Sequence, residues 1–181
     1  MNCNYLNQRV ITDYVTGKSV LDIGAEANRQ AVEKYLVEEK GYTRDQIIVD
    51  MELVLEISGE PYRTRLDLVV FMDNLPVMVI KCAAGSLFSR EREVIYAARV
   101  AQKQPIPIAV ASDGHDAVIF DAMERKLIGQ GLASIPSPED ARQILKNTKQ
   151  INVTTDKREK ERIIFRSYDI MNVNVPDEDV R

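Results

Sequence analysis

Apolar and polar residues alternate most regularly between residues 49 and 57. Apolar side chains take every second position, and acidic residues occupy most of the positions between them. This period predicts a strand with one buried face. Turn residues in SGEP and DNLP separate it from two more apolar segments, YRTRLDLVVFM and VMVIKC. The pattern predicts a three-stranded antiparallel meander, whose first strand buries Val49, Met51, Leu53, Leu55 and Ile57 on one face.

Segments with helical spacing lie on both sides of this meander in the sequence. They are residues 26–40 and the segment SREREVIYAARVAQKQ. Two further strands are predicted in PIPIAVAS and AVIFDA. The helix before them should form a right-handed crossover, which makes the third and fourth strands parallel. The predicted fold class is α/β: a mixed sheet in the order helix, three-strand meander, helix, strand, flanked by helices.

Two more helices are predicted near the C-terminus. Ser137 suits the N-cap of the first, and Pro138 suits its first helical position. TDKREKERIIFRSYDIM forms the second, which should bury Ile163, Ile164 and Tyr168, and a loose tail should follow. The predicted organisation is one α/β domain over residues 1–150 and a C-terminal helix with its tail over residues 151–181.

The chain of 181 residues has a net charge of −4. A dedicated nucleic-acid-binding domain usually has a basic surplus, so this charge weighs mildly against one. It leaves room for an acidic metal site that faces DNA within a basic rim. No apolar run is long enough for a membrane helix, and the first residues lack a secretory pattern. Cys3 and Cys82 lie far apart, so a reducing cytoplasm is the expected location.

The lengths of the two hairpin loops predict which charges face one another. If SGEP is a four-residue loop, Ile57 pairs with Tyr62, and Glu52 then faces Asp67. If MDNLP is a five-residue loop, Asp67 faces Lys81. Cross-strand neighbours lie about 4.5–5.5 Å apart at Cβ. A row of Glu52, Asp67 and Lys81 has two interpretations: a divalent-metal site with a lysine that orients water, or ordinary cross-strand ion pairs.

Three stretches resemble a known family: EANRQAVEKYLVEEKGY, RTRLDLVVFMDNLPVMVIKC and IPIAVASDGHDAVIFD. Their order is similar to that of the PD-(D/E)XK nuclease superfamily, and more narrowly to the N-terminal nuclease domain of type I restriction enzyme R subunits. The resemblance implies a restriction-endonuclease-like fold, Mg²⁺-dependent hydrolysis and DNA as the partner. Because the chain lacks a G-x-x-x-x-G-K-[ST] phosphate loop, a stand-alone relative of that nuclease domain is expected.

The resemblance also implies roles for single residues. Asp67 matches the metal-binding aspartate of the second strand, and Glu26 matches a glutamate at the start of the first helix. The acid-X-lysine triplet maps to residues 81–83, where Lys81 replaces the acid and Ala83 replaces the lysine. An alternative register on residues 79–81 keeps the lysine and still lacks the acid.

Some members of the superfamily carry the missing acid on the following helix. Glu91 and Glu93 are the candidates. A helical wheel places Glu91 at the edge of the sheet-facing stripe and Glu93 further aside, which favours Glu91. The alternative for both is a solvated first helical turn, where acids suit the helix dipole.

Two functional hypotheses follow. The first is a Mg²⁺-dependent nuclease acting on DNA through a rearranged site. The second is an inactive module that keeps the nuclease fold and binds nucleic acid or a protein partner. The predicted site residues fall into three groups: catalytic Asp67, Lys81 and Glu91; metal-binding Asp67, Glu52 and Glu26; and nucleic-acid-binding Arg63, Arg65 and Arg90.

Overall fold

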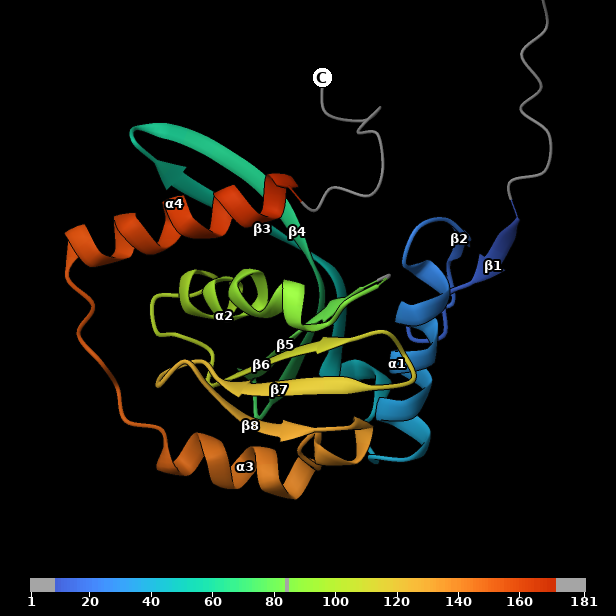
Figure 1. Ribbon diagram of the computed structural model, residues 1–181. Helices are drawn as coiled ribbons and strands as arrows, with labels where there is room; N and C mark the ends of the chain where they lie inside the picture. The colour runs from blue at the N-terminus through green and yellow to red at the C-terminus, as the bar shows by residue number, and fades with distance from the viewer. Residues whose placement is uncertain (1–8, 84, 172–181) are drawn as a thin grey trace, which may run out of the picture.

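The computed structural model describes residues 9–83 and 85–171. Their principal feature is a six-stranded mixed sheet with helices on both faces, seen in Figure 1. The strands of the sheet are β3 (Ile47–Ile57), β4 (Glu60–Met72), β5 (Leu75–Cys82), β6 (Ile108–Ser112), β7 (Ala117–Asp121) and β8 (Lys126–Gln130). The helices are α1 (Glu26–Glu38), α2 (Glu91–Val100), α3 (Pro138–Asn147) and α4 (Thr155–Met171). A small hairpin of β1 (Val10–Thr12) and β2 (Ser19–Leu21) precedes them, and short 3-10 turns span Arg44–Gln46, Phe88–Arg90 and Leu132–Ser134.

Strand order and direction confirm the predicted meander and crossover. The sheet order is β3-β4-β5-β6-β7-β8. The β5–β6 pair is parallel and is joined through α2, while the other pairs are antiparallel. The chain is therefore a mixed α/β protein, as predicted. β8 was not predicted because most of its side chains are exposed and it lacks the apolar alternation of a half-buried strand.

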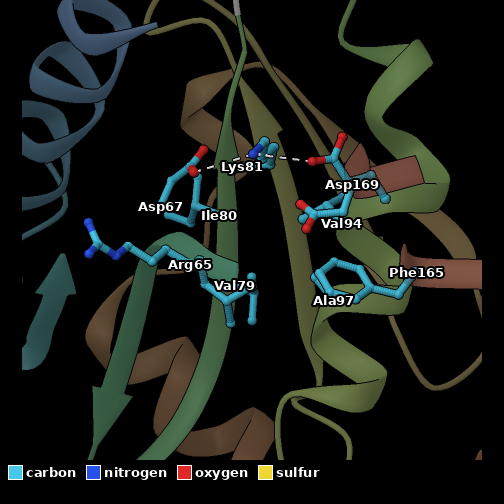
Figure 2. Close-up of a pocket in the computed structure, with 11 residues that line it drawn as sticks. Arg65, Asp67, Val79, Ile80, Lys81, Val94, Ala97, Phe165 and Asp169 are labelled. Carbon is cyan, nitrogen blue, oxygen red and sulfur yellow. Dashed lines mark hydrogen bonds and ion pairs between the residues drawn. The ribbon is translucent and has the colours of Figure 1, made fainter. Parts of the chain in front are cut away.

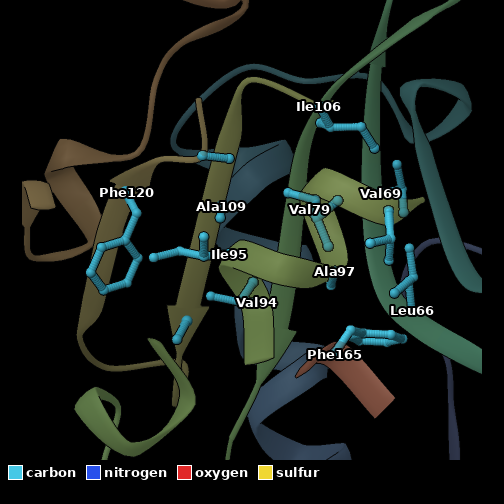
Figure 3. Packing of buried hydrophobic residues seen from close by; sticks show 14 of the residues in the cluster. Leu66, Val69, Val79, Val94, Ile95, Ala97, Ile106, Ala109, Phe120 and Phe165 are labelled. Atoms are coloured by element: carbon cyan, nitrogen blue, oxygen red, sulfur yellow. The ribbon is translucent and has the colours of Figure 1, made fainter. Parts of the chain in front are cut away.

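Two hydrophobic clusters cover the two faces of the sheet. On one face α2 packs on the sheet, and α4 adds Phe165 to the same cluster, as Figures 1 and 3 show. On the other face α1 contributes Val32 and Leu36, and α3 contributes Ala141. The sheet thus lies between α1 and α3 on one face and α2 with α4 on the other.

The side chains of the β3–β4 hairpin that point into the core switch from one face of the sheet to the other at Asp50 and Asp67. Val49 packs with the α1 and α3 cluster, whereas Met51 packs with the α2 and α4 cluster. The single-face prediction for the first strand was therefore wrong. Asp50 has a φ of 50°, a left-handed conformation that aspartate tolerates better than most residues. This residue rotates the strand, and alternation alone does not reveal such a rotation.

The β3–β4 register differs from the predicted one. The loop is the dipeptide Ser58-Gly59, with φ values of 55° and 83° that suit a tight two-residue hairpin. Ile57 therefore pairs with Glu60 and not with Tyr62. As a result Glu52 pairs with Arg65, so the predicted contact between Glu52 and Asp67 was wrong. The pairs on either side place Asp50 opposite Asp67.

The C-terminal helix α4 buries two residues that were not predicted, while the predicted Ile164 and Tyr168 are only partly buried. Phe165 and Glu161 are its buried residues, while Ile163 is 44% exposed. Glu161 is enclosed because it forms an ion pair of 2.7 Å with the buried Arg99 of α2. The prediction from apolar residues was therefore wrong for Ile163 and missed Glu161 and Phe165. The predicted loose tail, residues 173–181, lies outside the described residues.

Within the described residues, no helix combines the length and the apolar character that crossing a membrane requires.

Candidate active site between β4, β5 and α2

Lys81 at the end of β5 lies between two carboxylates from different elements. Its Nζ is 3.4 Å from Oδ1 of Asp67 on β4 and 3.2 Å from Oε1 of Glu93 on α2. The second oxygen of Asp67 accepts the backbone N–H of Cys82 at 2.7 Å. Figure 2 shows Lys81 beside Asp67, with a dashed line joining the two side chains. Asp67 and Lys81 are cross-strand neighbours, as predicted, because Leu68 pairs with Ile80.

The acid that α2 brings to Lys81 is Glu93 and not the predicted Glu91. Glu93 is 2% exposed and also forms an ion pair of 3.4 Å with Arg90. Glu91 begins α2 and is only partly buried. The helical wheel assumed one buried stripe, but α4 packs on α2 and encloses a second side of it. The position of Glu93 thus depends on a helix that lies far away in the sequence.

Burial and charge act in opposite directions on the ionisable groups of this site. Burial alone would lower the pKa of the Lys81 ammonium, but Asp67 and Glu93 outweigh it and raise that pKa above its ordinary value. Burial raises the pKa of Glu93, and Lys81 only partly offsets this. Lys81 therefore remains protonated at neutral pH.

A second group of charges, here named the α1 cluster, surrounds Arg29 on the opposite face of the sheet. Arg29 is 5% exposed. Its guanidinium lies 2.7 Å from Glu26 and 3.1 Å from Glu33, both on α1. It also lies 3.0 Å from Asp13 and 3.9 Å from Asp50. One buried cation thus faces four carboxylates.

Three members of the α1 cluster could have been recognised in the sequence. Glu26, Arg29 and Glu33 follow one another at spacings of three and four, which places them on one helix face. Asp13 and Asp50 come from other segments and carried no such signal. Both oxygens of the predicted metal ligand Glu26 contact Arg29.

The remaining predicted residues lie in different surroundings. Glu52 is exposed and forms an ion pair of 3.2 Å with the equally exposed Arg63. Arg65 is exposed on β4 and lines the same pocket as Asp67. Arg90 is buried at 7% exposure and contacts Glu93, so it is enclosed within the site and is not displayed on the surface.

The cavity beside Lys81 is small for a hydrated Mg²⁺ ion. The cavity has a volume of about 10 Å³, close to the space that one water needs. No three His, Cys, Asp or Glu side chains of residues 9–83 and 85–171 gather in a way that would hold a metal. Mg²⁺ is often held by one or two carboxylates, with water and phosphate completing its shell. Asp67 and Glu93 are two carboxylates beside this cavity, and Lys81 lies between them.

The buried acid Glu33 gives a pH-dependent prediction. Burial, and then the charge of Asp13, raise its pKa to about 7 from an ordinary value of 4.5. The folded state therefore holds this proton more tightly than the unfolded chain, and Glu33 reduces stability as pH rises from about 4.5 to 7.

Between pH 5 and pH 8, the free energy of unfolding should fall by about 1–3 kcal/mol less in Glu33→Gln than in wild type. Urea unfolding at the two pH values measures this difference. Glu39→Gln, at the exposed C-cap of the same helix, is the matched control. Equal pH dependence in Glu33→Gln and wild type would contradict the prediction.

Comparison with known proteins assigns the chain to a family. A mixed α/β fold that brings Asp67 of β4 to Lys81 of β5 is compatible with a nuclease-like domain. The family described as the type I restriction enzyme R protein N terminus matches residues 24–136, more than half of the chain. The chain belongs to this family, which indicates a nuclease-like domain. Searches among curated proteins and among solved structures returned no match.

Proposed function

We propose that the domain hydrolyses phosphodiester bonds in DNA with the help of a divalent metal, at a rearranged site of Asp67, Lys81 and Glu93. The observation that carries this proposal is the position of Glu93, which α2 brings to within 3.2 Å of Lys81. An acid on the following helix supplies the carboxylate that the strand triplet lacks. Membership of the restriction enzyme family supports DNA as the substrate.

Each side chain of the site has a distinct role in this proposal. Asp67 and Glu93 offer the oxygen ligands that a hard cation prefers. A bound Mg²⁺ would supply positive charge to the phosphoryl oxygens. Lys81 acts as a permanent cation and hydrogen-bond donor, because its raised pKa makes it a poor general base. It stabilises the charge that develops on the phosphate and orients the attacking water.

A plasmid-nicking assay with Mg²⁺ or Mn²⁺ tests the proposal, with metal calorimetry alongside. We expect Asp67→Asn and Glu93→Gln each to lower nicking about 10²–10³-fold and to weaken metal binding. Glu91→Gln and Glu52→Gln are matched controls, because the contacts described above do not bring either acid to Lys81. Nicking that survives unchanged in Asp67→Asn would contradict the proposed site.

A second candidate function is an inactive module that binds DNA or a protein partner. Two observations favour it: Lys81 already neutralises both carboxylates, and the second oxygen of Asp67 accepts a backbone N–H. The same experiment separates the two functions. The module would be favoured if calorimetry detects no heat of metal binding at millimolar metal. DNA binding would then depend on salt and remain intact in Asp67→Asn.

A further inference from the structure

A second cavity is lined by the segment that joins β5 to α2 and by the turn that joins β6 to β7. Its volume is about 290 Å³, close to the lower limit of the pockets that hold small ligands. The first segment contributes Leu87 and Phe88, the turn contributes Asp113 and Asp116, and β8 contributes Gln130. Of the described residues, none lines both this cavity and the one beside Lys81, so the two are separate sites.

Phe88 brings an aromatic ring to this cavity. Its side chain is 57% exposed, whereas the neighbouring Leu87 is 8% exposed and packs in the α2 and α4 cluster. The ring of Phe88 is therefore not used to fill the core and is accessible to a ligand. An accessible aromatic ring attracts ammonium and guanidinium groups to its face, because the face carries the negative part of the ring quadrupole.

Asp113 and Asp116 give the cavity a negative charge. The backbone N–H groups of His115 and Asp116 donate to Oδ1 of Asp113 at 2.9 and 2.8 Å. Partial burial raises the pKa of Asp113, but these hydrogen bonds outweigh it and hold that pKa below its ordinary value. Within the part of the chain that the structure describes, no lysine or arginine forms an ion pair with either carboxylate, and none lines the cavity. The two charges are thus available to a cation from outside.

We propose that this cavity, here named the Phe88 pocket, binds the guanidinium group of an arginine on a basic protein partner. A guanidinium stacks flat on an aromatic ring and pairs with carboxylates through its N–H groups, which matches Phe88 beside Asp113 and Asp116. The net charge of −4 favours the approach of a basic partner. A nucleobase also stacks on aromatic rings, but its phosphates would meet the two carboxylates. The proposal is independent of the hydrolysis proposed above.

A tryptophan reporter makes binding at the pocket visible, because the chain contains no tryptophan of its own. Phe88→Trp keeps an aromatic face for a cation. The probe is the peptide acetyl-Gly-Arg-Gly-Arg-Gly-amide, and in the control peptide the neutral citrulline replaces each arginine. We expect the arginine peptide to change the fluorescence of Phe88→Trp saturably and to bind about tenfold more tightly than the citrulline peptide. Leu75→Trp at the start of β5, where Leu75 is also 57% exposed, is the matched control and should not respond.

Removing the two charges tests the chemistry of the pocket. Asp113→Asn and Asp116→Asn each keep a side-chain oxygen that accepts the N–H groups of the turn. Together they should weaken binding of the arginine peptide to Phe88→Trp about three- to tenfold. Asp156→Asn removes one exposed charge of α4 and should leave the affinity unchanged.

Three results would overturn the proposal. They are equal binding of the two peptides, unchanged binding in the Asp113→Asn and Asp116→Asn variant, and equal weakening by Asp156→Asn. A short single-stranded oligonucleotide that changes the fluorescence of Phe88→Trp at lower concentration than the arginine peptide would also overturn it, because the pocket would then take a nucleobase. Calorimetry on the natural chain repeats the test without the reporter, and Phe88→Ala should weaken binding of the arginine peptide about two- to fivefold.

Discussion

Replacing Arg29 with methionine should destabilise the fold by about 3–5 kcal/mol at pH 8, the typical cost of leaving a buried charge without its partner. Arg29 is 5% exposed and is the cation that the α1 cluster surrounds. Methionine retains an apolar stem of similar length but leaves the carboxylates unpaired. Glu33, at 0% exposure, has no solvent to compensate this loss.

The loss in Arg29→Met should shrink when the pH falls to 5. Glu33 already has a pKa raised to about 7 in the presence of Arg29, and removing the guanidinium raises it further. An acid whose folded pKa lies above its unfolded value stabilises the fold at low pH and loses that stability as pH rises. In the folded variant Glu33 will therefore be protonated at pH 5. This removes most of the repulsion among the carboxylates of the α1 cluster.

Urea unfolding of Arg29→Met at pH 5 and pH 8 measures both effects. Arg142→Met is the matched control, because Arg142 is 46% exposed and its contact with Asp73 is 3.9 Å long. We expect that control to lie within about 0.5 kcal/mol of wild type, as for most surface substitutions. A loss in Arg29→Met that is equally large at both pH values would mean that lost packing, and not unpaired charge, is its cause.

The sequence predicted the contact between Asp67 and Lys81 correctly. The structure differs from the predicted β4–β5 hairpin in two ways, and their effects on the register cancel. The predicted five-residue loop is a dipeptide, Asp73-Asn74, which by itself would change the register. A β-bulge between Val70 and Phe71 restores it. The β3–β4 hairpin has no such compensation, so Glu52 was assigned the place that Asp50 occupies. Loop length alone therefore does not fix register when bulges and two-residue turns compete.

The parts of the site that sequence reasoning missed depend on contacts between distant segments. Glu93 is buried because α4 returns to cover α2, and a helical wheel of α2 contains no information about that. Asp13 reaches Arg29 from the segment between β1 and β2. Element order and the strand-borne residues Asp67 and Lys81 were predictable because they follow from local periodicity. The side chains that complete the site come from tertiary packing.

Replacing Lys81 with methionine should lower stability by about 2–4 kcal/mol at pH 8 and by less at pH 5. Glu93 is 2% exposed and would keep its ion pair with Arg90 at 3.4 Å, but it would lose the closer one with Lys81. Asp67 is more exposed and retains the N–H of Cys82, so the loss should arise mainly from Glu93. Burial already raises the pKa of Glu93, and loss of the ammonium raises it further, which makes stability fall as pH rises.

A double-mutant cycle identifies Glu93 as the source of that loss. Glu93→Gln removes the charge that Lys81→Met leaves unpaired, so the double variant should be more stable at pH 8 than the sum of the two single effects predicts. We expect a coupling of about 1–2 kcal/mol between the two positions. Additive effects would mean that the ion pair between β5 and α2 contributes little to the fold. In that case Lys81 could leave Glu93 to contact a phosphate at little cost in stability, with Asp67 still beside it.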